Sequence, residues 1–152
     1  MKKLLISLGV LFLMLLASLV YVVINGEELD RASKEYADQA VITIASDWNA
    51  QALLERASPE FMEAATGRKI ETLFAQLRKL GPMTKYEGSQ GQASSSYNLS
   101  ARTVTTTAVY VAQAEFEHGR AQMKITMIKR DGLWQILGFY VQGNGTPGRI
   151  AA

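Results

Sequence analysis

Residues 103–142 read TVTTTAVYVAQAEFEHGRAQMKITMIKRDGLWQILGFYVQ, and their pattern indicates a β-sheet. Three long runs rich in β-branched and aromatic residues are separated by two short pairs, His118-Gly119 and Asp131-Gly132. Two-residue loops of this kind close tight hairpins, because their backbone twist matches that of the strands they join. The stretch therefore predicts three consecutive antiparallel strands.

The two loops also predict the register of these strands. If Glu117 faces Arg120 across the first loop and Arg130 faces Leu133 across the second, one face of the sheet carries no charge. That face consists of Tyr110, Ala112, Ala114, Met123, Ile125, Met127, Trp134, Ile136 and Tyr140. An apolar face must be covered, so we expect it to pack against amphipathic helices.

The opposite face of the same strands mixes polar and apolar residues. Its apolar members are Val109, Val111, Ile128, Leu137, Phe139 and Val141. A face in water throughout would be more polar, so we interpret these six residues as an association face, most simply that of a homodimer. The alternative is that a β-bulge or the end of the chain covers them.

Helical periodicity dominates the preceding residues 27–81, where apolar residues recur at spacings of three and four. The first such stripe is Ala37, Val41, Ile44 and Trp48, and the last is Ile70, Leu73, Phe74, Leu77 and Leu80. Asn49 and Ser58-Pro59 indicate helix starts, since Asn and Ser can cap and Pro suits the first turn. Gly81-Pro82 ends the helical region, and the Gly- and Ser-rich residues 83–97 predict a further, irregular strand.

Residues 4–24 form an apolar run of 21 without a charged side chain. A helix of this length spans about 30 Å, the thickness of the hydrocarbon core of a bilayer. A cleaved signal peptide usually has a shorter apolar region of about 7–15 residues, so we predict an uncleaved transmembrane anchor. Lys2 and Lys3 predict a cytoplasmic N-terminus by the positive-inside rule.

These patterns predict an α+β protein in three parts. Residues 1–26 are a cytoplasmic tip and inner-membrane anchor, residues 27–142 are a periplasmic or extracellular domain, and residues 143–152 are a flexible C-terminal tail. The domain consists of helices packed on a bent antiparallel sheet of about four strands. Lys2 and Lys3 account for the net charge of +2, so the balanced remainder argues against nucleic-acid binding.

The order of helices and sheet resembles the nuclear-transport-factor-2-like superfamily. The resemblance covers about residues 35–142; it includes the segments 48–54 and 58–61, and its most specific part is the Asp-Gly-x-Trp-x-Ile hairpin of residues 131–136. It implies a cone in which a long helix and the sheet enclose a pocket, commonly in a dimer. Members include isomerases, dehydratases, ligand binders and non-catalytic assembly modules, so the resemblance alone selects no function.

Candidate catalytic groups are few. His118, the one histidine, falls in a predicted hairpin loop and fits a turn residue. Asp38 and Asp47 lie in the first helical region, where each fits either a pocket carboxylate or a solvated helix face. The chain has no cysteine and no Gly-rich phosphate loop, and its histidine and carboxylates are not spaced as metal ligands would be. We therefore expect no cofactor.

Four residues, Trp48, Tyr110, Met127 and Trp134, are candidates for lining a pocket in the cone. They would suit an apolar, aromatic or lipid-like ligand, although such residues also fill ordinary cores. Our leading hypothesis is a non-enzymatic scaffold or accessory module that acts through protein contacts, with a second copy or another membrane or periplasmic protein as its partner. Ligand binding in the cone, or an isomerase- or hydrolase-like enzyme with a pocket carboxylate, are the alternatives.

Overall fold

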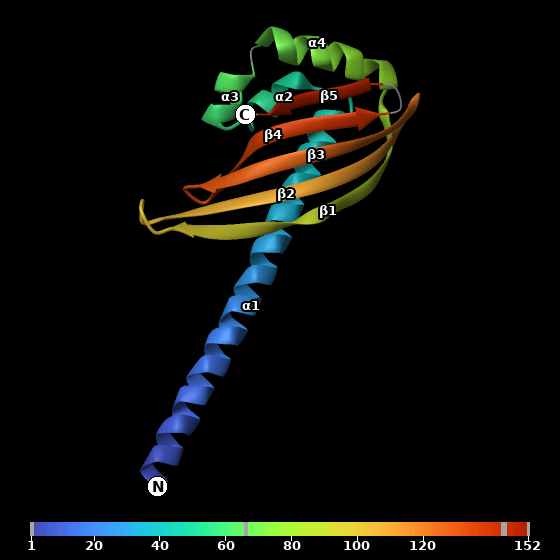
Figure 1. Cartoon of the computed structure of the whole chain (residues 1–152). Coiled ribbons are helices and arrows are strands. Elements are labelled where there is room, and N and C mark those ends of the chain that lie inside the picture. Colours follow the sequence, from blue (N-terminus) through green and yellow to red (C-terminus); the bar gives the residue numbers. More distant parts are fainter. Residues whose placement is uncertain (1, 66, 144–145, 152) are drawn as a thin grey trace. The chain divides into compact units, whose positions relative to one another are not determined.

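The computed structural model describes residues 2–65, 67–143 and 146–151 (Figure 1). The helices are α1 (Lys2–Ala45), α2 (Ala50–Leu54), α3 (Pro59–Ala64), α4 (Gly67–Leu77) and the 3-10 helix η1 (Arg78–Leu80). The strands are β1 (Met83–Asn98), β2 (Thr103–Phe116), β3 (Gly119–Arg130), β4 (Leu133–Gly143) and β5 (Thr146–Ala151). The chain divides into two compact units, Met1–Ala32 and Ser33–Ala152, so α1 begins in the first unit and ends in the second.

The first unit is the N-terminal part of α1, in which the apolar side chains 10–16 are exposed. Among the residues that the structure describes, no helix is both long enough and apolar enough to cross a membrane. This finding overturns the predicted transmembrane anchor at residues 1–26. The apolar run is instead the beginning of a 44-residue helix that continues into the charged residues 27–35.

In the second unit, the predicted helix starts are confirmed. The Asn49 side chain accepts a hydrogen bond from the Ala52 amide (3.1 Å), and the Ser58 hydroxyl accepts one from the Phe61 amide (3.2 Å). Both bonds satisfy amide groups that the first turn of a helix leaves without a partner. Trp48 does not continue the α1 stripe, because α1 ends at Ala45 and Trp48 has a left-handed backbone with φ of 55°.

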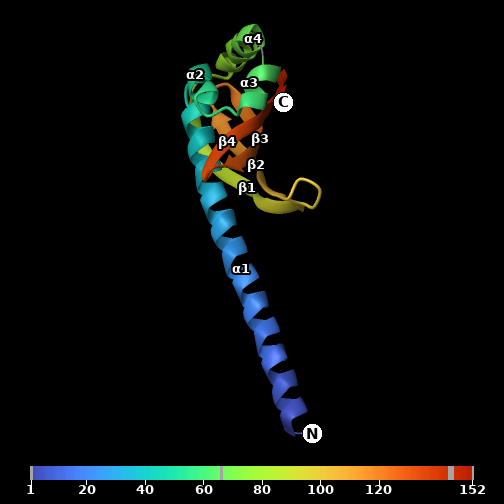
Figure 2. The same ribbon diagram turned by 90° about the vertical axis from the view of Figure 1, so that its left-hand side faces the viewer.

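All five strands form one antiparallel sheet in the order β1-β2-β3-β4-β5. The sequence predicted about four strands and a flexible tail at residues 143–152, whereas β5 lies in that tail and pairs with β4, with Phe139 opposite Ile150. The last part of α1 crosses one face of the sheet. The helices α2, α3 and α4 gather near the C-terminal end of α1 (Figure 2). The core forms where these helices meet the sheet, and Val41, Phe74 and Ile125 are fully buried there.

The β2–β3 hairpin keeps the predicted faces but not the predicted register. Phe116 lies opposite Gly119 and Glu115 opposite Arg120, so the turn is one step earlier than the loop at His118-Gly119 indicated. Met123 therefore lies opposite Ala112, two residues before its predicted partner Ala114. Because side chains alternate with a period of two, every residue stays on its predicted face, and the inner residues Ala112 and Met123 are buried.

The β3–β4 hairpin starts as predicted, with Arg130 opposite Leu133, but a β-bulge then interrupts it. Met127 lies opposite Ile136, whereas the next pair is Thr126 with Gly138, so Leu137 is the extra residue on β4. The bulge inverts the faces of the rest of β4. Phe139 and Val141 are therefore fully buried in the core, which corrects their assignment to the association face, and Tyr140 moves to the outer face.

Candidate functional site

Three of the four predicted pocket residues, Trp48, Tyr110 and Met127, are buried in the core. The Trp48 ring stacks on Phe116 with ring centroids 4.8 Å apart, and its indole N–H donates to the Gly81 carbonyl oxygen. Trp134 is half-buried at the β3–β4 hairpin, where the Lys129 ammonium lies 5.6 Å from its ring centroid. The structure therefore brings Trp48, Tyr110 and Met127 together as packed core and places Trp134 at the surface.

The remaining predicted site residues are spread over the second unit. His118 lies in the β2–β3 turn, where its backbone amide donates to the Leu80 carbonyl oxygen (2.9 Å), and Asp47 is exposed after the end of α1. On the outer face of the sheet, Val109 is 38% exposed and Val111 is half-buried. Ile128 and Leu137 are half-buried as well. The predicted association face is thus smaller and less apolar than expected.

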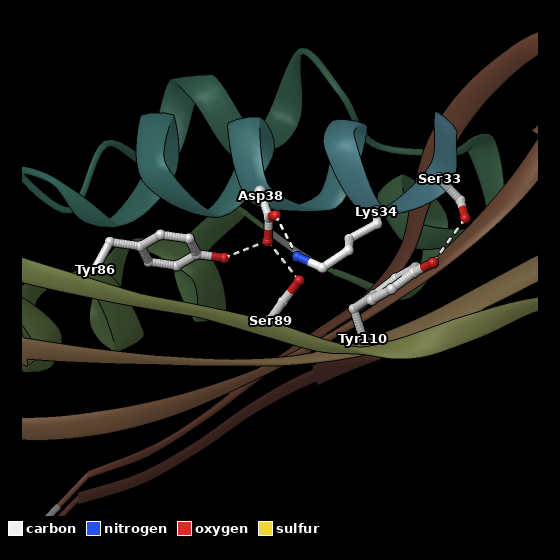
Figure 3. A network of polar contacts seen from close by, with 6 residues as sticks. All are labelled: Ser33, Lys34, Asp38, Tyr86, Ser89 and Tyr110. Carbon is white, nitrogen blue, oxygen red and sulfur yellow. Dashed lines mark hydrogen bonds and ion pairs between the residues drawn. The ribbon is translucent and has the colours of Figure 1, made fainter. Parts of the chain in front are cut away.

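Asp38 is the centre of a polar network between α1 and β1 (Figure 3). Its carboxylate accepts hydrogen bonds from the Lys34 ammonium (2.7 Å), the Tyr86 hydroxyl (2.6 Å) and the Ser89 hydroxyl. We call these four residues the Asp38 clamp. Nearby, the Ser33 and Tyr110 hydroxyls lie 2.9 Å apart and form a second link between helix and sheet.

A β-bulge in β1 makes this clamp possible. Tyr86 and Ser89 are three residues apart, so a regular strand would place their side chains on opposite faces. The register shifts between Tyr86 and Gly88, and Gly88 has a φ of 100°, a conformation that favours glycine. As a result both hydroxyls reach Asp38.

The electrostatics of the Asp38 clamp argue for a structural role. Burial raises the pKa of the Asp38 carboxyl, but hydrogen bonds from Lys34, Ser89 and Tyr86 outweigh it and hold the pKa below its usual value. Burial, the hydrogen bond to Asp38 and the charge of that carboxylate raise the pKa of the Tyr86 phenol. Neither pKa is shifted toward neutral pH, as that of a general acid or base would be. The hydrogen bonds from Tyr86 and Ser89 to Asp38 instead fasten β1 to α1.

Two adjoining hollows lie at the outer side of the sheet, and the larger is lined in part by the clamp residues Lys34 and Ser89. The larger, of about 750 Å³, is lined by Lys34, residues 87–91, Val111, Gln113 and Gln122. The smaller, of about 340 Å³, shares Glu87, Gln113 and Gln122 and adds Arg120 and Gln142. Val111 and Gln113 alternate along β2 with buried residues and therefore lie on the outer face of the sheet, whereas Lys34 belongs to α1 on the inner face. The larger hollow thus reaches around the edge of β1.

Beyond the clamp, the β1–β2 hairpin projects from the body of the second unit (Figure 2). We call its end, residues 94–107, the arm. Arg102 is the single charged residue between Gly88 and Ala114. The large apolar side chains of the arm are exposed: Tyr97 by 57%, Leu99 by 83% and Val104 by 65%. The sequence predicted an irregular strand up to residue 97 and a firm strand from Thr103, and a stretch this long with a single charged residue was a usable signal for the arm.

Among the described side chains, no cluster of three or more His, Cys, Asp or Glu residues could hold a metal ion. Comparison with protein-family models, with curated proteins and with solved structures finds no match for this chain.

Proposed function

We propose that this chain is a non-enzymatic interaction module that binds a partner protein through the arm. The observation that carries the proposal is an ordered hairpin whose large apolar residues, Tyr97, Leu99 and Val104, are in water. Apolar side chains grouped at one exposed place are typical of protein interaction sites. A second copy of the chain is the simplest partner, since most soluble oligomers are homo-oligomers.

The internal bonds of the arm support this proposal. The Ser95 and Thr106 hydroxyls lie 2.9 Å apart across the two strands, and the Asn98 side chain accepts hydrogen bonds from the Ser100 and Ala101 amides in the turn. A two-stranded hairpin is marginally stable in water by itself. These bonds, together with the Asp38 clamp at its base, restrict the conformations of the arm, which lowers the entropy that binding costs.

The polar groups of the Asp38 clamp already bond to one another, which favours binding over catalysis as the function of the chain. The Asp38 carboxylate already accepts three hydrogen bonds, and the Tyr86 hydroxyl is occupied as a donor. Burial of Trp48 and Tyr110 in the core gives no support to a ligand in the cone. The order of elements, a long helix, short helices and then an antiparallel sheet, supports our further proposal that the domain is of the nuclear-transport-factor-2-like class.

Site-specific photocrosslinking in cells tests the proposal. A photoreactive amino acid replaces Leu99 in the full-length chain, and a matched chain carries it at Leu133, which is 68% exposed at the tip of the β3–β4 hairpin. We expect discrete protein adducts from position 99 and few from position 133. Tyr97→Ser in the same chain should reduce the adducts about tenfold, because it removes the aromatic anchor of the arm. Equal adduct yields at the two positions contradict the proposal.

A further inference from the structure

Three glutamines form a row across the outer face of the sheet, at the end opposite the arm. Gln142 of β4 lies opposite Gln122 of β3, Gln122 lies opposite Gln113 of β2, and Gln113 lies opposite Gly88 of β1. Neighbouring strands are about 4.8 Å apart, so the amides follow one another at about this spacing. We call Gln113, Gln122 and Gln142 the glutamine row.

The two hollows make the row into a groove. The smaller hollow is lined by all three glutamines, and the larger continues from Gln113 and Gln122 to residues 87–91 of β1 and to Lys34. Gly88 ends the row without a side chain, and a Cβ there would meet no atom within 4 Å. The groove therefore crosses the strands and stays open at the β1 edge.

The amides of the row are available to a ligand. All three side chains are exposed, and within the described part of the chain none of them is hydrogen-bonded. A primary amide offers two N–H donors and one carbonyl acceptor. Glutamines stacked in neighbouring strands can also bond to one another, but these three do not. The row thus presents repeated donors and acceptors in a line.

We propose that this groove binds an extended glycan chain, with successive sugar units along the glutamine row. An extended peptide advances only about 3.4 Å per residue and alternates its faces, so its repeat does not match the row. A pyranose unit is longer than an amino-acid residue, and its hydroxyl and acetamido groups both donate and accept hydrogen bonds. These are the groups that primary amides bind.

The neighbouring residues fit a glycan with little net charge. Tyr140 lies opposite Lys124 in the next row, where its half-buried ring offers a flat face for a sugar ring. The Arg120 guanidinium at the groove is already paired with Glu115, and the Lys34 ammonium is paired with Asp38. Glu87, which lines both hollows, lies 4.0 Å from the Lys85 ammonium, so each charged residue that lines the groove has an oppositely charged neighbour, which suits a neutral polymer.

Titration of the full-length chain with chitohexaose, followed by NMR of the glutamine side-chain amides, tests the proposal. We expect saturable shifts of the Gln113, Gln122 and Gln142 signals, while the exposed amides of Gln39 and Gln76 stay unchanged. Gln122→Leu removes the central amide and should raise the Kd about tenfold, an effect typical of a lost hydrogen bond in a binding site. The matched surface variant Gln76→Leu should bind as the wild type does.

Three results would overturn the glycan assignment. One is the absence of shifts at millimolar chitohexaose, another is an equal effect of Gln122→Leu and Gln76→Leu, and the third is a hexaalanine peptide that shifts the same signals with the same affinity. The thermal midpoint of Gln122→Leu, measured first, establishes that the variant is folded. Failure here leaves the arm untouched, because crosslinking at Leu99 reports a different end of the sheet.

Discussion

Removal of the Tyr86 hydroxyl tests whether the Asp38 clamp fastens β1 to α1. In Tyr86→Phe the ring can stay in place, while the 2.6 Å hydrogen bond to the Asp38 carboxylate is lost. Hydrogen bonds to charged groups contribute about 1.5–3 kcal/mol when buried. Asp38 is only partly buried and keeps Lys34 and Ser89 as donors, so we expect a loss at or just below this range, about 1–1.5 kcal/mol.

Urea unfolding of the wild type and the variant, monitored by circular dichroism, measures this loss. The control is Ser95→Ala, which removes an exposed hydrogen bond on the arm and should cost less than about 0.5 kcal/mol. A double-mutant cycle with Asp38→Asn should show a coupling free energy of about 1 kcal/mol between the two residues. If Tyr86→Phe is as stable as the wild type, or the coupling is zero, the clamp does not hold the strand.

Three further predictions concern the core and the surface of the second unit. Gly91→Ala should cost more than about 2 kcal/mol in urea unfolding, because its Cβ would lie 2.0 Å from a backbone oxygen of β2. Phe139→Asp should unfold the domain, with loss of the near-ultraviolet circular dichroism signal, because Phe139 is fully buried. Leu137→Asp should leave the domain folded, because Leu137 is only half-buried. The hydrogen bonds from Arg130 lower the pKa of the Glu60 carboxyl to about 2, so its stabilising contribution is present above pH 4.5 and is lost between pH 4.5 and 2. Glu60→Gln should therefore flatten the fall of the thermal midpoint across this window, and an unchanged slope would refute the contribution of this ion pair.

Periodicity predicted the faces of the strands better than their register. The two-residue error in the β2–β3 hairpin moved no side chain to the other face, so the apolar inner face of β2 and β3 was predicted correctly. The bulge at Leu137 adds a single residue, which inverts the faces beyond it. Gly138, directly after the extra residue, is the one sequence signal for this bulge, because an isolated glycine in a strand often marks one. The predicted register did not include a bulge there, and Phe139 and Val141 were therefore assigned to the wrong face.

The functional features were predicted least well, because they depend on irregular backbone and on contacts between distant residues. Asp38 was a candidate carboxylate, but its partners Tyr86 and Ser89 come together only through the bulge at Gly88. The glutamine row depends on the register of three hairpins, of which β2–β3 was predicted with a shift and both β1–β2 and β3–β4 contain a bulge. The apolar residues 4–24 predicted a membrane span that the structure does not support.

Hydrogen–deuterium exchange of the arm is the decisive measurement for the claim that this hairpin binds a partner. The full-length chain is isolated from cells as its native assembly and compared with the same chain carrying Leu99→Asp, and exchange is followed by mass spectrometry of peptides. Binding through the arm predicts that amides of residues 97–104 exchange at least about tenfold more slowly in the wild-type assembly, while peptides from α4 exchange equally in both. Equal exchange of residues 97–104 in the two chains would contradict the claim.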